Sequence, residues 1–275
     1  MKRFYLSVLF LCSFGSLFAG GPSFAFCDYS QGKVFIQENG EIVWEHKAPD
    51  SNDIWVLPNK NILFTAGKEV LEVSRKNDTI FHYTSESNIF ACQRLKNGNT
   101  FIGECDNGRL LEVSPDGSIV KDVSILPFGV KTGGHAFMRN ARCLDNGHYL
   151  VAHYGGKSVV EYDENGKAVW NIPISGGAHS VIRLPSGNTL VAVTDKDNNP
   201  GVFEYDMAGN IVWSLTNKDL PGTLKFAGGM HYLSDGRLFL TNWVGHVDAK
   251  NPVHLLVIDK LSKKVLYKVS DRNDI

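Results

Sequence analysis

Five copies of one short hairpin pattern constrain the fold of this chain more than any other feature. Each copy is an apolar run, a polar turn that usually contains glycine, and a second apolar run. The copies align on leucines that lie 38 to 49 residues apart, at Leu57, Leu95, Leu144, Leu184 and Leu233. Asn-Gly and Asp-Gly dipeptides between strand-like runs are strong hairpin signals because these residues tolerate a positive φ. The pattern therefore predicts a repeat protein built from antiparallel hairpins.

A second hairpin pattern follows each of the first ones. Its clearest copies are Glu161–Trp170 and Glu204–Trp213, and a further copy, Phe35–Trp44, precedes the first leucine hairpin. Two hairpins make a four-stranded blade of about 40 residues, which is the period of a β-propeller. We therefore predict an all-β fold, a six-bladed β-propeller of four-stranded antiparallel blades. The sixth blade is shared between the termini: Ser23–Tyr29 forms one of its strands, and its innermost strand is either missing or supplied by Ser270–Ile275.

The first nineteen residues have the layout of a secretory signal peptide. Lys2 and Arg3 precede an apolar run over residues 4–18, and Ala19 follows it. This run is too short for a membrane span. We expect a signal peptide over residues 1–19, a propeller domain over residues 20–275, and export to the periplasm or the extracellular space. Cys12 leaves a lipoprotein as the alternative.

Composition excludes several classes of protein. The chain has 28 Lys and Arg against 29 Asp and Glu, so it lacks the positive excess of a dedicated nucleic-acid binder. The four cysteines outside the signal segment do not have zinc-site spacing; Cys92 and Cys105 either pair across a hairpin or remain free thiols. No metalloprotease, nucleophile-elbow or EF-hand motif is present. We predict a monomer with no metal, no cofactor and no membrane span.

The long connections of the predicted propeller fall on one face. In a propeller, the loops between blades and the loops between the second and third strands emerge together around the central axis. Long loops on one face and minimal turns on the other mark the functional face. Ten polar or aromatic residues in or beside these loops are the candidate ligand-binding residues: His135, Arg139, Arg142, His153, Tyr154, His179, His231, Asn242, Trp243 and His246.

Other recurring features are expected to be structural. Trp44, Trp170 and Trp213 recur at one position of the outermost strand, where a bulky ring fills the space between neighbouring blades. Gly133-Gly134 and Gly176-Gly177 precede no helical pattern, so no phosphate-binding loop is indicated. The acidic run at residues 195–199 lacks the terminal Glu of a calcium loop, and we expect a solvated loop there.

The alternating hairpins resemble those of a known family. Tyr-Asp-x-x-Gly-x-x-Val-Trp at residues 205–213 and Arg-Leu-x-x-Gly-Asn-Thr-Leu-Val at residues 183–191 are similar to quinoprotein-type (PQQ-like) propeller repeats. Residues 134–139, 149–154, 219–222 and 241–246 resemble secreted propellers of Bacteroidetes-type bacteria. More distantly, the shape is similar to the arylsulfotransferases, six-bladed periplasmic propellers with a central histidine nucleophile. The resemblance implies the fold over the whole mature chain; a quinone cofactor is not expected.

Two functions of different classes are compatible with the sequence. The first, which we favour, is a non-catalytic recognition module that binds a small polar or anionic ligand, or a protein at the propeller rim. The second is a transferase, lyase or hydrolase that uses a funnel histidine as base or nucleophile. The enzyme requires a histidine with a carboxylate or Asn partner beside Arg139 or Arg142. The competing outcome for the funnel is that Asp195 or Glu104 already neutralises these arginines, which would leave a channel that holds only water. No catalytic residue can be assigned from the sequence.

Overall fold

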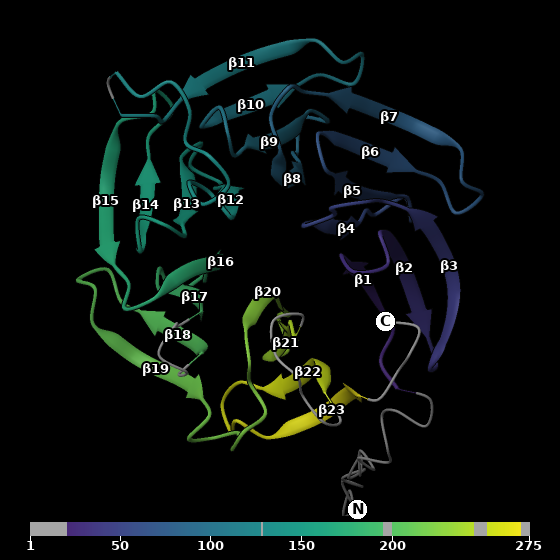
Figure 1. Ribbon diagram of the computed structural model, residues 1–275, viewed down its shortest axis with the longest axis vertical. Helices are drawn as coiled ribbons and strands as arrows, with labels where there is room; N and C mark the ends of the chain where they lie inside the picture. Colours follow the sequence, from purple (N-terminus) through teal and green to yellow (C-terminus); the bar gives the residue numbers. More distant parts are fainter. Residues whose placement is uncertain (1–20, 128, 195–199, 245–251, 271–275) are drawn as a thin grey trace, which may run out of the picture.

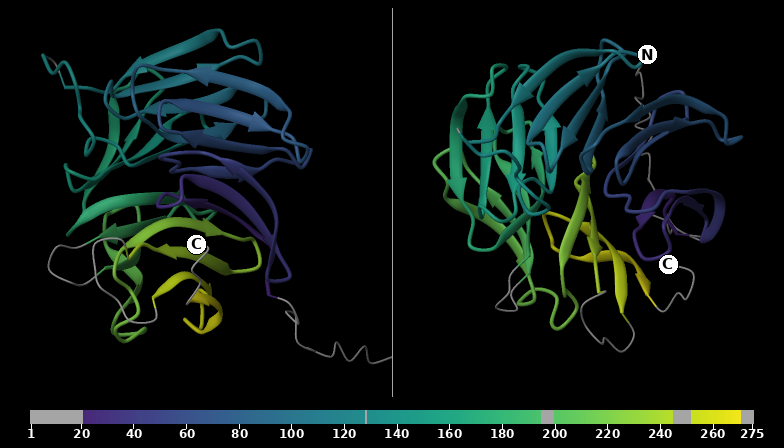
Figure 2. Two further views of the ribbon diagram at one scale, coloured as in Figure 1. Left: turned by 45° about the vertical axis from the view of Figure 1, so that its right-hand side comes forward. Right: turned by 45° about the horizontal axis from the view of Figure 1, so that its top comes forward.

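The protein is a ring of six β-sheets around a central axis (Figure 1). The structure is a computed structural model that describes residues 21–127, 129–194, 200–244 and 252–270. These residues form β-strands and turns and contain no helix. The predicted all-β, six-bladed β-propeller is therefore confirmed. We number the sheets as blades I to VI in chain order, and Figure 2 shows them side by side around the ring.

The strands within each blade follow one another from the axis to the rim. Blade I contains β1 (Phe24–Asp28), β2 (Lys33–Glu38) and β3 (Glu41–Lys47). Blade II contains β4 (Ile54–Val56), β5 (Ile62–Ala66), β6 (Glu69–Val73) and β7 (Thr79–Thr84), and blade III contains β8 (Ile89–Arg94), β9 (Thr100–Glu104), β10 (Arg109–Val113) and β11 (Ile119–Ser124). Blade IV contains β12 (Asn140–Cys143), β13 (Tyr149–His153), β14 (Ser158–Tyr162) and β15 (Ala168–Pro173). Blade V contains β16 (Gly177–Arg183), β17 (Thr189–Thr194), β18 (Gly201–Tyr205) and β19 (Ile211–Thr216), and blade VI contains β20 (Ala227–Tyr232), β21 (Arg237–Asn242), β22 (Val253–Asp259) and β23 (Val265–Ser270).

All neighbouring strands within a blade pair antiparallel, and the predicted hairpins are confirmed. Blade I has three strands among the described residues, with β1 standing where Ser23–Tyr29 was expected to form a strand. The candidate fourth strand falls outside the described residues except for Ser270, which ends β23. The signal segment also lies outside them.

Turn chemistry explains why the hairpins could be read from the sequence. In the turn between β12 and β13, the amide of Gly147 donates to the carbonyl of Leu144 at 2.9 Å. Gly147 has a φ of +84°, a conformation that costs glycine no steric penalty. The backbone of Leu144 and His148 then closes the hairpin with a 2.8 Å bond.

The hydrophobic cores lie between blades. Every residue of β9, β13 and β17 is buried, because neighbouring blades cover both faces of these second strands. On the outermost strand the aromatic side chain packs inward, as Trp44 does against Ile62 and Phe64 of blade II. Phe81, Trp170 and Trp213 have the same role at the next junctions. The predicted structural role of these aromatic residues is confirmed.

A belt of ion pairs joins blades on the face that carries the tight turns. Glu161 of β14 accepts a 2.6 Å bond from Arg183 of blade V and contacts His148 at 2.8 Å. The Arg183 guanidinium also stacks on Trp170, 4.7 Å from the ring centroid. Two other junctions repeat the arrangement with Glu72–Arg94 at 2.6 Å and Glu204–Lys260 at 2.5 Å. At three junctions, II–III, IV–V and V–VI, one blade therefore contacts the next through a carboxylate, a cation and an aromatic ring.

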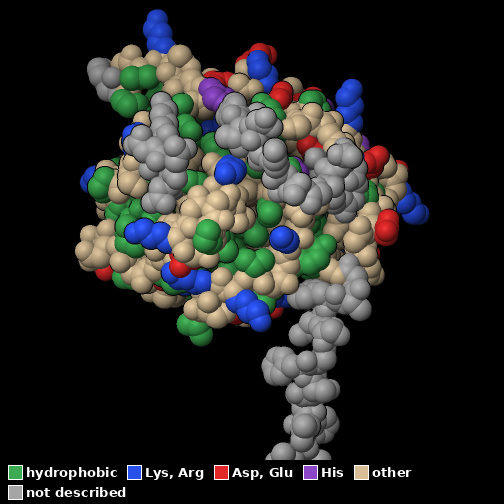
Figure 3. Space-filling model, turned by 60° about the horizontal axis from the view of Figure 1, so that its bottom comes forward, with side chains coloured by type: hydrophobic (Ala, Val, Ile, Leu, Met, Phe, Trp, Pro, Cys, Tyr) green, Lys and Arg blue, Asp and Glu red, His purple; other side chains and the backbone are tan. Residues whose placement is uncertain are grey.

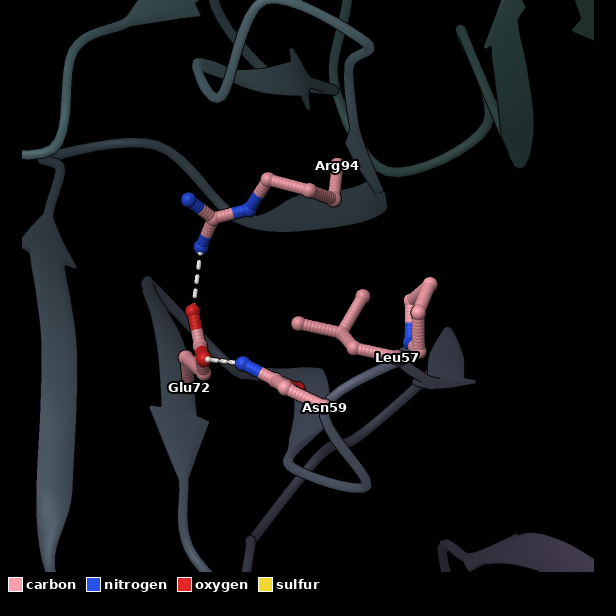
Figure 4. Close-up of a pocket in the computed structure, with 5 residues that line it drawn as sticks. Leu57, Asn59, Glu72 and Arg94 are labelled. Carbon is pink, nitrogen blue, oxygen red and sulfur yellow. Dashed lines mark hydrogen bonds and ion pairs between the residues drawn. The ribbon is translucent and has the colours of Figure 1, made fainter.

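Figure 4 shows one of these junctions, where Glu72 accepts from Arg94 and Asn59. A hollow of 220 Å³ opens beside them, lined also by Leu57 and Pro58. Both oxygens of Glu72 already accept hydrogen bonds from protein groups. The hollow is thus a by-product of the belt, on the face opposite the long loops.

The surface and the cysteines add little chemistry. Lys and Arg side chains on the side shown in Figure 3 stand mostly apart, among hydrophobic and neutral groups. Among the described residues, no helix is long and apolar enough to cross a membrane. Cys27, Cys92, Cys105 and Cys143 are free thiols, so the alternative of a Cys92–Cys105 disulfide is not realised.

The belt predicts a stability effect. Glu161→Gln should lower the free energy of unfolding by about 1–3 kcal/mol, because it leaves the half-buried Arg183 guanidinium without its counter-charge. Urea unfolding measures this loss. Glu164→Gln, the same change at an exposed turn position, is the control and should cost almost nothing. Equal stabilities of the two variants would contradict the structural role of the belt.

Candidate functional site

Arg139 lies at the start of the innermost strand of blade IV, on the face of the long loops. Its amide donates to the carbonyl of Ala152 at 3.0 Å, which fixes the backbone where the loop enters β12. The preceding residue, Met138, is fully buried and anchors the loop in the core. The Arg139 side chain therefore projects from a rigid base, although the loop before it is irregular.

Two histidines and a phenylalanine surround the Arg139 guanidinium. One guanidinium nitrogen lies 2.9 Å from Nε2 of His135, and the other lies 3.4 Å from Nε2 of His179. Phe90 of β8 covers one face of the guanidinium, with 4.5 Å between Cζ and the ring centroid. We call these four residues the Arg139 cluster. It joins blades III, IV and V at the axis.

Both imidazoles of the cluster are neutral. Arginine can only donate hydrogen bonds, so Nε2 of each histidine accepts and the proton resides on Nδ1. Burial, followed by the charge of Arg139, lowers the pKa of His179 to about 3. The same two causes lower the pKa of His135. The cluster therefore carries the single positive charge of Arg139.

No carboxylate within the described ranges forms an ion pair with Arg139. Burial lowers the pKa of its half-buried guanidinium, and the groups that oppose this are Cys105, Tyr154 and Tyr29, none of them acidic residues. Two carboxylates that act on neighbours of Arg139 have other partners: Asp106, near His135, accepts from both nitrogens of Asn88, and Asp50 bonds Tyr29. Arg139 is thus a partly dehydrated cation with no paired counter-ion among these residues.

Arg142 is in the opposite situation. Arg142 lies within β12, three residues after Arg139 and about 10 Å deeper along the axis. It forms a bidentate ion pair with Asp53 of blade II, with N–O distances of 2.6 and 3.0 Å. Asp53 also accepts the Cys92 amide of blade III at 3.0 Å. The Arg142 guanidinium lies 5.1 Å from the ring centroid of Trp55. The acidic partner of Arg142 is therefore Asp53, not Glu104 or Asp195 as the sequence suggested. Glu104 pairs with Arg109, and Asp195 lies outside the described residues.

Several predicted site residues are occupied by protein groups. His153 is buried and bonds the carbonyl of Phe137 and the hydroxyl of Tyr162, both at 2.8 Å. Asn242 is buried and accepts the amides of Lys225 and Phe226. Both side chains therefore hold the backbone of a loop in place and are not available to a ligand. His246 lies outside the described residues.

The remaining candidates form a row of rings that leads away from Arg139. Tyr154 and Phe226 each contact His179 edge to face, with centroids 6.4 and 5.2 Å from its ring. Trp243 contacts Phe226 in the same way at 5.3 Å. His231 instead lies deeper, with its ring 6.3 Å from that of Trp55. The structure therefore brings five predicted residues into one region, His135, Arg139, His179, Tyr154 and Trp243, while His231 lies with Trp55 and Arg142.

Sequence reasoning missed three members of this region. Asp53 lies within a connection that had been assigned to the functional face, so its position was a usable signal. Phe226 gave the same signal, because it lies at the end of the loop between blades V and VI, just before β20. Phe90 has no signal of its own, because an aromatic residue within a strand is ordinary core. The Gly176-Gly177 pair also gains an explanation: a Cβ at Gly177 would lie 2.5 Å from the Tyr154 ring, so the missing side chain admits that ring.

Within the described part of the chain, no group of three or more His, Cys, Asp or Glu side chains is arranged to hold a metal ion. The chemistry that remains is that of the cluster: one guanidinium, two neutral imidazoles and several aromatic rings. Such a set can bind an anion and can stack against a ring.

Comparisons with known proteins place the fold. No protein-family model and no curated protein matches the chain. A protein of unknown function from Bacteroides caccae has a similar structure, with a TM-score of 0.80 and 23% identity over 91% of this chain and 94% of that one. A streptogramin B lyase is similar with a TM-score of 0.63 and 13% identity, over 92% and 80% of the two chains. The virginiamycin B lyase of Staphylococcus aureus is similar with a TM-score of 0.59 and 14% identity, over 93% and 85%. At these identities the likeness concerns the fold alone.

Asp53 should be critical for stability. Asp53→Asn removes the counter-charge of Arg142 and is expected to lower the free energy of unfolding by about 3–5 kcal/mol. The double variant Asp53→Asn/Arg142→Gln should recover part of this loss because it also removes the stranded cation. Asp122→Asn, which breaks an exposed pair with Arg109, is the control for urea unfolding and should cost less than about 1 kcal/mol. A loss no larger in Asp53→Asn than in this control would contradict the assignment.

The neutral state of His179 predicts a pH dependence. Its pKa in the folded protein, about 3, lies below the ordinary value of 6.5. Between these values the unfolded chain binds a proton that the folded chain does not, so stability falls as the pH decreases from about 6.5 towards about 3. His179→Gln should flatten this slope by up to about one proton. Urea unfolding at several pH values tests this, and an unchanged slope would show that His179 is protonated in the fold.

Proposed function

We propose that this protein is an exported, non-catalytic recognition module that binds a small anion at Arg139. The observation that carries the proposal is the contrast between two arginines three residues apart, Arg139 just before β12 and Arg142 within it. Arg142 is neutralised by Asp53, whereas Arg139 has no acidic partner among the described residues and contacts two neutral imidazoles. Burial disfavours the charged guanidinium, and an anion would restore the missing counter-charge.

The donor geometry supports this proposal. A guanidinium has five N–H donors, of which two point to His135 and His179, leaving three for a ligand. Phe90 covers one face of the group, so a ligand would approach in the plane of the guanidinium, where paired N–H bonds to a carboxylate or phosphate form. His135 is exposed and Arg139 is half-buried, so the cluster is accessible from solvent.

The enzyme alternative has weaker support. Two of the structural neighbours are lyases, and Arg139 sits beside histidines, as a catalytic site would require. A general base or nucleophile also needs an orienting partner. Among the described residues, neither His135 nor His179 has a carboxylate or amide side-chain partner. The histidines that have one are His148 on the opposite face, with Glu161, and His82 and His46 on outermost strands, with Glu69 and Asn77. Recognition without catalysis is therefore the function that we favour.

Arg139→Gln tests the proposal. Calorimetry and thermal shift with acetate, sulfate, inorganic phosphate and benzoate should reveal at least one ligand of the wild type, stabilising it by about 2.7 kcal/mol at a hundredfold excess over Kd. Arg139→Gln should abolish the response, since it removes the charge but keeps much of the volume. Arg75→Gln, at an exposed ion pair with Glu38, is the matched control and should respond fully.

Two results would contradict the proposal. If no anion binds the wild type, the cluster is structural and binding of a protein at the rim becomes the better function. If Arg139→Gln responds as the wild type does, the anion binds elsewhere.

A further inference from the structure

We infer that the ligand of the Arg139 cluster is a monoanion carried on a ring, that is, a ring carboxylate such as an aromatic acid or a sugar acid. This inference rests on the proposed function and narrows it. Two independent features carry it: the charge of the cluster and the row of rings beside it.

The charge of the cluster matches one negative charge. Arg139 contributes one positive charge, and both histidines accept at Nε2 and are neutral. Two carboxylates lie in the surroundings without pairing with Arg139: Asp106 is held by Asn88 near His135, and Asp50 is bonded to Tyr29. A second negative charge on the ligand would be repelled by these carboxylates, and the cluster has no second cation that could pair with it. Phe90 covers one face of the guanidinium and leaves its edge accessible. A planar carboxylate can accept two parallel N–H bonds at that edge.

The rings indicate what the carboxylate is attached to. Tyr154 and Phe226 flank His179, and Trp243 continues from Phe226. Tyr154 follows β13 of blade IV, Phe226 precedes β20 of blade VI, and Trp243 follows β21 of the same blade. All three rings are half-buried, so part of each remains exposed. Their edge-to-face contacts hold them rigidly, and rigid aromatic surface next to an anion site suits a flat or ring-shaped ligand. Gly177 has no side chain where the Tyr154 ring packs, which keeps that ring in the row.

Four ligands test the charge of the cluster and the row of rings separately. Their binding is measured by titration calorimetry at pH 8 with the chain lacking residues 1–19. Benzoate and acetate have the same charge and differ by the ring, and we expect benzoate to bind about tenfold tighter. Glucuronate replaces the flat ring with a sugar ring and distinguishes the two sources of a ring carboxylate. Phenyl phosphate keeps the ring but is a dianion above a pKa of about 6, and it should bind no tighter than benzoate.

A variant tests the position of the ring. Phe226→Leu should reduce the advantage of benzoate over acetate several-fold, because it removes ring surface beside the cluster while the Arg139 charge remains. Phe26→Leu, at a half-buried ring of blade I that stacks on Phe35, is the matched control and should retain the full advantage.

The outcomes separate this inference from the proposed function. If acetate binds as tightly as both benzoate and glucuronate, or if phenyl phosphate binds tenfold tighter than benzoate, the ring carboxylate is wrong and the anion site stands. If Phe226→Leu keeps the full benzoate advantage, the row of rings is not the ligand surface. If none of the four ligands binds and sulfate also fails, both proposals are overturned.

Discussion

The ion pair between Asp53 and Arg142 is the interaction on which the centre of the molecule depends. Asp53 comes from blade II, Arg142 from blade IV, and the amide that completes the arrangement belongs to Cys92 of blade III. A propeller has no core at its axis comparable to those between its blades, so contacts that cross the axis fix the blades relative to one another. The pair also separates two neighbouring arginines by role: Arg142 within β12 is structural, and the charge of Arg139, just before β12, is not paired with a described carboxylate.

Both faces of the propeller place a cation on an aromatic ring, but the cation has a structural role on one face and a proposed ligand-binding role on the other. On the face of the tight turns, Glu72, Glu161 and Glu204 each neutralise a cation from the next blade, and an aromatic ring lies beneath the cation. On the face of the long loops, Arg139 also lies on a ring, but histidines stand where the belt has a glutamate. Replacing an acceptor carboxylate with neutral imidazoles converts a structural junction into a candidate anion site.

The fold could be predicted from the sequence because its signals are local. Each turn glycine, such as Gly147, and each recurring tryptophan acts within one hairpin or one junction, so the repeat was visible without any tertiary contact. The region of the site was also predictable, since loop length marks one face. The roles of individual residues were not. Asp53 is 89 residues from Arg142 in the chain, and no local pattern indicates that His153 turns towards Phe137 and Tyr162 while His179 turns towards Arg139.

Arg139, and not Arg142, offers a positive charge at the axis that no described carboxylate pairs. A crystal grown or soaked in sodium bromide tests it directly, because bromide scatters anomalously and takes the place of a bound anion. We expect an anomalous peak within hydrogen-bonding distance of the Arg139 guanidinium and none at Arg142. An Arg139 guanidinium paired with a carboxylate of the chain, with no bromide beside it, would show that Arg139 is not an anion site.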